Sequence, residues 1–213
     1  YEEYSLDADY VKNDVTVGEL RGKILTIMRP NQGTDPDGYF AEKAPKGMTF
    51  ISGFPGSHAN GTTQAYCKPE YFDYGNDQWG ARTEWIVYCQ NYYDVPSDKI
   101  NDKITSVKTY LDLAKNQADV CSHVWVINHC SGYLGSNIGS GYANLANKLN
   151  PEIYEYVNKR EEPGSLGIVL LDYVGRMRWE NWFTEVDVYG DLLPQLIIDN
   201  NYKYYLKRKP KQQ

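Results

Sequence analysis

The chain has 213 residues, with 28 acidic against 22 basic side chains and a formal charge of −6. Its hydrophobic fraction of 41% is that of a packed domain and excludes wholesale disorder. No apolar run approaches the roughly 20 residues that cross a bilayer, and the acidic balance argues against a nucleic-acid partner. The 20 tyrosines fit either an ordinary core or a surface that stacks on sugar rings or rests at a membrane interface.

Four short apolar runs predict buried parallel strands. They cover residues 23–28, 84–90, 122–128 and 166–172, and each is nearly continuous in apolar residues. Strands covered on both faces show this pattern, whereas half-exposed strands alternate.

Helical periodicity separates the later runs. Ser97 can cap a helix whose apolar residues recur from 100 to 114. Residues 142–149 and 152–159 predict two helices, the second with Pro151 in its first turn, and residues 191–200 predict another. Strands alternating with helices indicate an α/β fold with right-handed βαβ units.

Residues 30–83 have little periodicity and carry turn-forming pairs such as Asn60-Gly61. We therefore expect a single domain over 1–213 with a long loop insertion at about 30–83, and such insertions tend to be functional. The basic tail at about 202–213 is expected to be solvated, the alternative being a lipid-headgroup or phosphate patch.

The four cysteines match no zinc or redox spacing. Cys121 and Cys130 flank one predicted strand, so nine residues at about 3.3 Å each place them too far apart for a disulfide. Free buried thiols, or a bridge through Cys67 or Cys89, both stay open. No glycine-rich phosphate loop, serine-hydrolase elbow or metal-binding carboxylate cluster occurs, so no cofactor and no metal are expected.

Polar side chains follow every predicted strand. Ligands bind where parallel strands end in α/β folds, so these side chains are candidates for a binding rim. Each could instead be structural, as a cap or as one half of an ion pair. The candidates are Arg29, Asn91, Tyr93, Asn128, His129, Asp172 and Tyr173.

Several motifs resemble the bacterial phosphatidylinositol-specific phospholipase C family. Residues 17–29, VGELRGKILTIMR, resemble its "LGE-RGKI-LL-R" segment, and residues 167–173, GIVLLDY, resemble its "GIV-MDY" strand. Residues 124–132 are similar to its "INF-S-GG" strand and loop, and residues 150–152 match the "NPE" opening of a helix. These motifs keep their order from about residue 10 to residue 201.

The resemblance implies a TIM-type barrel that cleaves phosphoinositides or glycosyl-phosphatidylinositol anchors through a cyclic phosphate, without a metal. This chain would be its C-terminal half, with four parallel strands and their helices. Asp172 would orient the general-base histidine, and Arg29 would contact inositol hydroxyls. Asn91 stands where the family carries an inositol-binding aspartate, and Tyr93 stands where the inositol ring packs.

The family's catalytic histidines and arginine belong to the first half of the barrel, in a "PGTHDS"-like motif that residues 55–61, PGSHANG, match only superficially. We therefore expect no turnover by the isolated chain, unless a missing N-terminal half or a second chain completes the barrel. The alternatives are a non-catalytic carbohydrate or lipid-headgroup binding module, or a purely structural domain. The expected ligand is a phosphoinositide or inositol phosphate at a membrane surface, and the expected location is secreted or cell-envelope.

Overall fold

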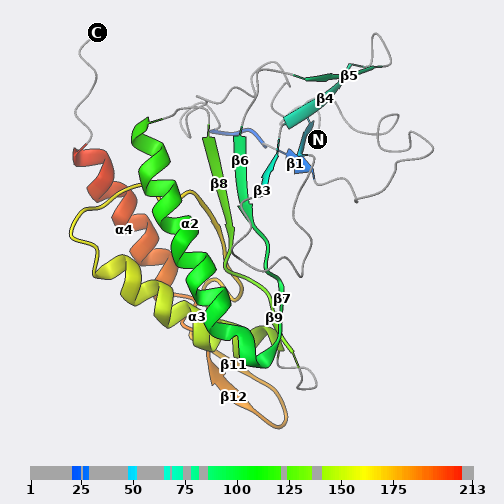
Figure 1. Ribbon diagram of the computed structural model, residues 1–213. Helices are drawn as coiled ribbons and strands as arrows, with labels where there is room; N and C mark the ends of the chain where they lie inside the picture. Colours follow the sequence, from blue (N-terminus) through cyan, green and yellow to red (C-terminus); the bar gives the residue numbers. More distant parts are fainter. Residues whose placement is uncertain are drawn as a thin grey trace. The chain divides into compact units, whose positions relative to one another are not determined.

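The computed structural model describes residues 21–24, 26–28, 48–51, 65–67, 69–73, 78–81, 86–120, 124–135 and 141–207 (Figure 1). The chain divides into two compact units. The first holds residues 1–54, 65–88 and 121–125, and the second holds residues 55–64, 89–120 and 126–213. The expectation of a single domain stays a prediction.

Short strands make up the described part of the first unit. The strands β1 (Thr26–Met28), β2 (Met48–Ile51), β4 (Pro69–Asp73) and β5 (Gln78–Ala81) form one sheet in the order β1-β2-β4-β5. The β1–β2 pair is parallel, whereas β2–β4 and β4–β5 are antiparallel. Strands β2, β4 and β5 therefore lie where the sequence predicted a long loop. The prediction missed them because strands of four or five residues are too short to show a hydrophobic period.

The second sheet has the order β10-β8-β6-β3. It contains β10 (Ile168–Leu170), β8 (Val124–His129), β6 (Ile86–Gln90) and β3 (Ala65–Cys67), and β8 and β10 are parallel. The first three coincide with predicted apolar runs, and the α/β class with parallel strands is confirmed. The remaining run forms β1, which pairs in the other sheet.

The barrel implied by the resemblance is not closed. Strand β10 lies at the edge of its sheet, and Ile168 and Leu170 are 42% and 37% exposed. A strand of a closed barrel would instead have a neighbouring strand on each side.

Three helices pack beside one another in the second unit (Figure 1). One 3-10 turn, η2 (Ser97–Lys99), leads into α2 (Ile100–Val120), which is followed by α3 (Gly141–Asn158) and α4 (Leu192–Lys207). No helix in the described part of the chain is long and apolar enough to span a membrane. The core beneath them is aliphatic, with Val107, Leu111, Leu145, Leu149, Ile153 and Leu193 fully buried.

Helix α3 corrects one prediction. The sequence suggested two helices separated before Pro151, but a single helix of 18 residues runs through that proline. An internal proline costs about 3 kcal/mol, because it removes one main-chain hydrogen bond and crowds the preceding turn. Leu149 and Ile153, on either side of it, are both fully buried, and burying such side chains contributes about 1.5–3 kcal/mol each. Burial therefore outweighs the break.

Two small elements were not predicted. The strands β7 (Asp94–Val95) and β9 (Tyr133–Leu134) form a parallel pair just beyond β6 and β8. After β10, the strands β11 (Arg178–Glu180) and β12 (Glu185–Asp187) form an antiparallel hairpin. Gly190 follows the hairpin and has no room for a side chain, because a Cβ there would collide with the carbonyl of Tyr173.

Two of the cysteines form no disulfide. Cys89 and Cys130 are both buried and unbridged. Burial raises the pKa of the Cys130 thiol to about 12, so this side chain behaves as a small hydrophobic group.

Gly132, in the connection from β8 to β9, tests how tightly this end of the sheet is packed. A Cβ there would lie 2.6 Å from the carbonyl oxygen of Tyr93 and 3.0 Å from Leu145 Cδ2. We expect Gly132→Ala to lower the free energy of unfolding by about 2 kcal/mol or more, as measured by chemical denaturation. Gly135→Ala is the control, since its Cβ would meet nothing closer than 3.7 Å. Equal stability of the two variants would contradict the packing.

Candidate functional site

A buried lysine organises the carboxyl ends of β6 and β8. Lys103 on α2 is 0% exposed, and its ammonium donates to four oxygen atoms. Two acceptors follow β6, namely Gln90 Oε1 at 3.2 Å and the carbonyl of Tyr92 at 2.6 Å. The other two are the carbonyls of His129 at 2.5 Å and Ser131 at 3.2 Å, which end β8. One cation therefore ties both strand ends to the helix.

Gln90 completes this polar connection. Its Nε2 donates to Asn128 Oδ1 at 3.2 Å and to the His129 carbonyl at 2.9 Å, while its Oε1 accepts the amide of Tyr92 at 2.6 Å. Asn128 Nδ2 in turn donates to the carbonyl of Val107 on α2 at 2.9 Å. A fully used set of donors and acceptors fixes the geometry of these loops.

Burial changes the proton affinity of Lys103. It lowers the pKa of the ammonium to about 8, because the charged form loses its water. The carboxylate of Asp172 and the nearby thiols act in the opposite direction. At pH 7 the lysine still carries its proton and can serve all four acceptors.

Asp172 lies where β10 ends, above this connection. Its side chain is half-buried, and Oδ2 accepts the main-chain N–H of Gly132 at 3.2 Å. Burial raises the pKa of this carboxyl group, while the Gly132 amide and the Lys103 ammonium oppose that rise. The Gly132 amide in the β8–β9 connection thus holds the carboxylate in place. A carboxylate can accept further hydrogen bonds beyond this one.

Two tyrosines, Tyr93 and Tyr173, interact electrostatically with this carboxylate. Tyr93 forms a side-chain hydrogen bond with Tyr142, which is the largest cause that raises the pKa of Tyr93 to about 12. Their rings lie 6.2 Å apart, and Asp172 raises the pKa of both Tyr93 and Tyr173 electrostatically. We name this cluster of Tyr93, Tyr142, Asp172 and Tyr173 the carboxylate rim.

The structure brings three predicted site residues together, at 93, 172 and 173. Asn91 is buried in the connection after β6, and Arg29 lies outside the described residues. Asn128 is fully buried toward α2, with its amide engaged inside the protein. His129 contributes its carbonyl to Lys103, and its side chain is half-buried. The binding roles assigned to these residues stay predictions.

Two members of the site were missed from the sequence. Tyr142 opens α3 and gave no signal beyond being one of many tyrosines. Lys103 did give one, because it lies on the apolar stripe of α2, four residues before Val107. A lysine on the buried face of a helix indicates an internal polar partner.

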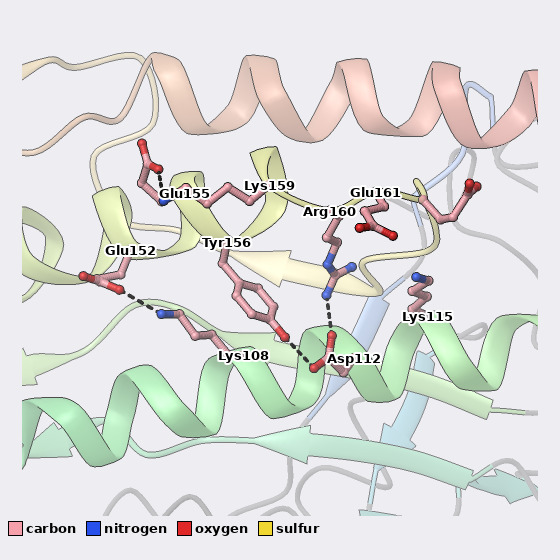
Figure 2. Close-up of a pocket in the computed structure, with 10 residues that line it drawn as sticks. Lys108, Asp112, Lys115, Glu152, Glu155, Tyr156, Lys159, Arg160 and Glu161 are labelled. Carbon is pink, nitrogen blue, oxygen red and sulfur yellow. Dashed lines mark hydrogen bonds and ion pairs between the residues drawn. The ribbon is translucent and has the colours of Figure 1, made fainter.

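A second candidate is a pocket of about 550 Å³ between α2 and α3 (Figure 2). Its charged side chains neutralise one another. Lys108 pairs with Glu152 at 2.8 Å, and Lys159 pairs with Glu155 at 2.8 Å. The complete lining is Lys108, Asp112, Lys115, Glu152, Glu155, Tyr156, Lys159, Arg160, Glu161 and Glu162.

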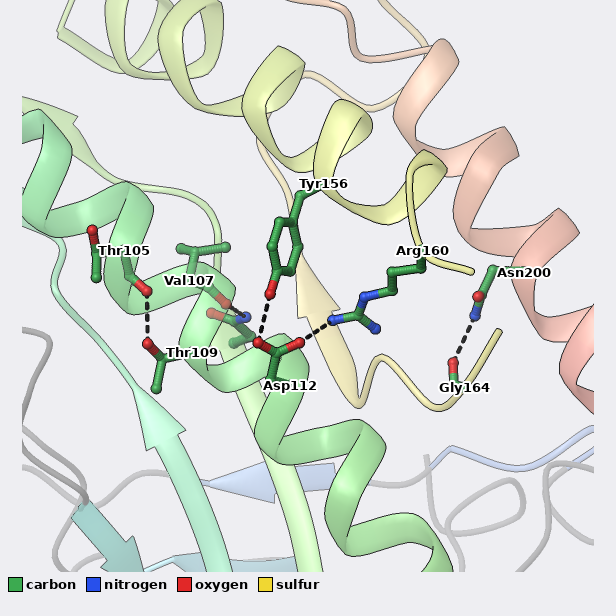
Figure 3. A network of polar contacts seen from close by, with 9 residues as sticks. Thr105, Val107, Thr109, Asp112, Tyr156, Arg160, Gly164 and Asn200 are labelled. Atoms are coloured by element: carbon green, nitrogen blue, oxygen red, sulfur yellow. Dashed lines mark hydrogen bonds and ion pairs between the residues drawn. The ribbon is translucent and has the colours of Figure 1, made fainter. Parts of the chain in front are cut away.

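Asp112 is the centre of this second cluster (Figure 3). It accepts the Tyr156 hydroxyl at 2.5 Å and Arg160 Nη2 at 2.9 Å. Arg160 and Lys108 also lie over the Tyr156 ring, at 5.2 Å and 5.4 Å from its centroid. Because these contacts join α2 to α3 and use most of the charge, the cluster is a clamp between helices rather than a binding site. Among the described residues, no group of His, Cys, Asp or Glu side chains could hold a metal ion.

The clamp predicts a stability effect. Asp112→Ala leaves the guanidinium of Arg160, whose side chain is 9% exposed, without its carboxylate. We expect a loss of about 2 kcal/mol in unfolding free energy, because a buried charge without a partner is costly, although Asp112 itself is half-exposed. Glu155→Ala is the control. It breaks the exposed Glu155–Lys159 pair and should change the free energy of unfolding little. A neutral Asp112→Ala variant would contradict the clamp.

Lys103 predicts a larger loss with a distinct pH dependence. Lys103→Met removes a donor from four oxygen atoms, of which Gln90 Oε1 and the His129 carbonyl each keep one other donor, and we expect a loss of about 3 kcal/mol near pH 7. In the unfolded chain the lysine has an ordinary pKa of about 10.4, so between about pH 8 and that value the unfolded state binds more protons. The contribution of Lys103 to the free energy of unfolding must therefore rise with pH between about pH 8 and pH 10.4, and it must be constant below that window.

Denaturant titrations of the wild type and Lys103→Met between about pH 7 and pH 10.5 measure this difference. Lys99→Met is the control, because Lys99 is exposed. A constant difference between wild type and Lys103→Met across the window would contradict the lowered pKa.

No family model matches the sequence, and no curated protein matches it. Among solved structures, the chain is similar to a double mutant of the phosphatidylinositol-specific phospholipase C from S. aureus, with a TM-score of 0.39 and 23% identity over 55% of this chain. It spans 33% of the length of that structure. A single-site mutant of the same Staphylococcus aureus enzyme matches with a TM-score of 0.48 and 16% identity, over 86% of this chain and 67% of that one. The structural resemblance is partial and distant.

Proposed function

We propose that the carboxylate rim binds the polyol headgroup of a phosphodiester lipid, of the phosphoinositide or inositol phosphate type. The observation that carries this proposal is the half-buried Asp172 carboxylate, which accepts the Gly132 N–H at 3.2 Å and interacts electrostatically with Tyr93 and Tyr173. A carboxylate can accept hydrogen bonds from two hydroxyl groups of one polyol ring at once. Aromatic rings can pack against the C–H face of that polyol ring.

Charge at the rim is consistent with a phosphate beside the ring. Arg176 is exposed and acts electrostatically on Tyr173, so a guanidinium lies near the rim. Arginine presents a planar fork of donors that fits phosphate oxygens. Lys103 does not serve this purpose, because its donors are used by four protein oxygens.

The finer proposal is that the chain belongs to a phospholipase C-like phosphodiesterase. In that chemistry the inositol 2-hydroxyl attacks phosphorus, the bond to the lipid oxygen breaks, and a cyclic phosphate forms while diacylglycerol leaves with a proton. Asp172 would position the general base, and Arg29 and Asn91 would contact ring hydroxyls, as the sequence resemblance implies.

The second candidate function is binding without chemistry. It is favoured by the exposed Ile168 and Leu170 side chains of β10, beside which the described residues place no further strand. The 213-residue chain, incubated with phosphatidylinositol vesicles, should release no inositol cyclic phosphate. Steady release that Asp172→Asn abolishes would instead establish the phosphodiesterase.

Binding itself is tested by calorimetric titration of the chain with soluble inositol 1-phosphate. Asp172→Asn should weaken affinity about tenfold or more, because a hydrogen bond to a charged group contributes about 1.5–3 kcal/mol. Asp191→Asn, which removes an exposed carboxylate at the start of α4, should leave affinity unchanged.

The affinity should also depend on pH. Because burial raises the pKa of Asp172, the carboxylate takes up a proton at a higher pH than an ordinary aspartate does. Affinity should therefore decline on acidification before ordinary aspartates titrate, and this decline should be absent in Asp172→Asn. Wild-type affinity in the Asp172→Asn variant would sink the proposed site.

A further inference from the structure

A single peptide group lies between the Lys103 ammonium and the Asp172 carboxylate. Its carbonyl oxygen, from Ser131, accepts a hydrogen bond from Lys103 Nζ at 3.2 Å. Its N–H, from Gly132, donates to Asp172 Oδ2 at 3.2 Å. The C=O and N–H of a trans peptide group point to opposite sides, so a cation lies at one end of the peptide dipole and an anion at the other.

The two contacts of this peptide group strengthen each other. A cation that draws electron density onto the carbonyl oxygen makes the N–H a better donor, and hydrogen bonds in a chain polarise one another by about 10–30%. Lys103 is fully buried and Asp172 is half-buried, so solvent screens both charges less than it does at an open surface. Lys103 and Asp172 also act on each other electrostatically. The buried charge thus acts on the carboxylate of the rim through the Ser131–Gly132 peptide group.

The backbone around Gly132 fixes the orientation of the peptide group. Gly132 has a φ of 154°, which residues with a side chain rarely adopt. The next amide, that of Tyr133, donates to the carbonyl of Tyr93 at 2.8 Å. The peptide group is therefore held between two fixed neighbours and cannot rotate away from Lys103 without breaking the β7–β9 pairing.

We propose that Lys103 is a positioning residue for the headgroup site and holds the Asp172 carboxylate in its ligand-binding position through the Ser131–Gly132 peptide group. The inference rests on the proposed function, because it concerns how the carboxylate rim is kept ready for its ligand. Lys103 itself does not contact the ligand, since it is fully buried. The peptide group uses one hydrogen bond of Asp172, and the remaining lone pairs of the carboxylate can accept ligand hydroxyl groups.

The proton on Lys103 should therefore control the headgroup affinity. The ionisable groups that act on the ammonium are Cys89 of β6, Cys130 after β8 and Asp172 after β10. Burial lowers the pKa of Lys103 to about 8, so the side chain becomes a neutral amine above that pH. The amine has one donor fewer than the ammonium and a lone pair that carbonyl oxygens repel. It cannot serve the four oxygen atoms that the ammonium holds together.

Calorimetric titrations of the whole chain with inositol 1-phosphate, from about pH 7 to about pH 9.5, test the proposal. The affinity of the wild type should fall about tenfold as Lys103 loses its proton, with a midpoint at about pH 8. The phosphate of the ligand does not interfere, because it titrates at about pH 6. A constant affinity across this range would overturn the proposal.

Two variants assign the alkaline decline to its residue. Lys103→Met should bind about tenfold more weakly than the wild type near pH 7 and show no further decline at higher pH. Lys99→Met, which removes an exposed ammonium just before α2, is the matched control and should keep the wild-type profile. An alkaline decline that persists in Lys103→Met would overturn the proposal. Circular dichroism at each pH checks the fold of this variant, and if it does not fold, the two readouts on the wild type below decide the question.

The stability of the wild type separates positioning from packing. The contribution of Lys103 to the free energy of unfolding rises with pH above about pH 8, because the unfolded chain then binds more protons at this residue. A role confined to packing would leave the affinity constant or let it follow this rise. Affinity that falls while this contribution rises supports positioning, and affinity that rises with it would overturn the proposal.

Amide NMR of the chain without ligand separates this proposal from the headgroup site. The Gly132 N–H should shift in two steps, one as Asp172 takes up a proton on acidification and one at about pH 8 as Lys103 loses its proton. In Lys103→Met the second step should vanish and the first should move to higher pH, because the ammonium opposes the rise in the pKa of Asp172.

The two proposals then fail in different ways. Both Gly132 steps without any binding of inositol 1-phosphate would support the connection from Lys103 to Asp172 and contradict the headgroup site. Binding that Asp172→Asn weakens, without a Gly132 step at about pH 8, would support the headgroup site and overturn the role of Lys103.

Discussion

The Lys103 ammonium is the interaction on which the rest of the site depends. It is fully buried and lies among oxygen atoms from the ends of β6 and β8. An ammonium has three N–H donors, so four acceptors must converge closely to share them. This convergence sets the position of the β8–β9 connection, in which the Gly132 amide holds Asp172. The Lys103 ammonium, which does not contact the proposed ligand, therefore positions the Asp172 carboxylate, which we propose binds it.

The sequence predicted the elements that bury a continuous apolar run. The strands β6, β8 and β10 and the helix α2 fall where their hydrophobic patterns place them, and α2 buries Val107 and Leu111 in the core. It could not predict β11 and β12, whose three-residue strands are stabilised by side chains of α3 rather than by their own pattern. The prediction of a helix break at Pro151 was wrong for a related reason. The burial of Leu149 and Ile153 outweighs the low helix propensity of proline.

The candidate site was predicted only where strand ends carry it. Tyr93, Asp172 and Tyr173 are candidates because the carboxyl ends of parallel strands meet at one edge, and their binding roles stay predictions. Tyr142 comes from the start of a helix, and its contact with Tyr93 depends on how α3 packs, which no local pattern encodes. Trp182 and Phe183 in the β11–β12 hairpin show the converse, since their aromatic side chains suggest core residues in the sequence but are almost fully exposed in the structure.

The central claim is that the carboxylate rim, and not the pocket between α2 and α3, receives a polyol phosphate. The most direct measurement is a two-dimensional amide NMR titration of the chain with inositol 1-phosphate. The N–H of Gly132, which donates to Asp172, should shift most, together with those of Tyr93 and Tyr173. Shifts confined to residues of the helix clamp such as Asp112 and Arg160, or no shifts at millimolar ligand, would contradict the account.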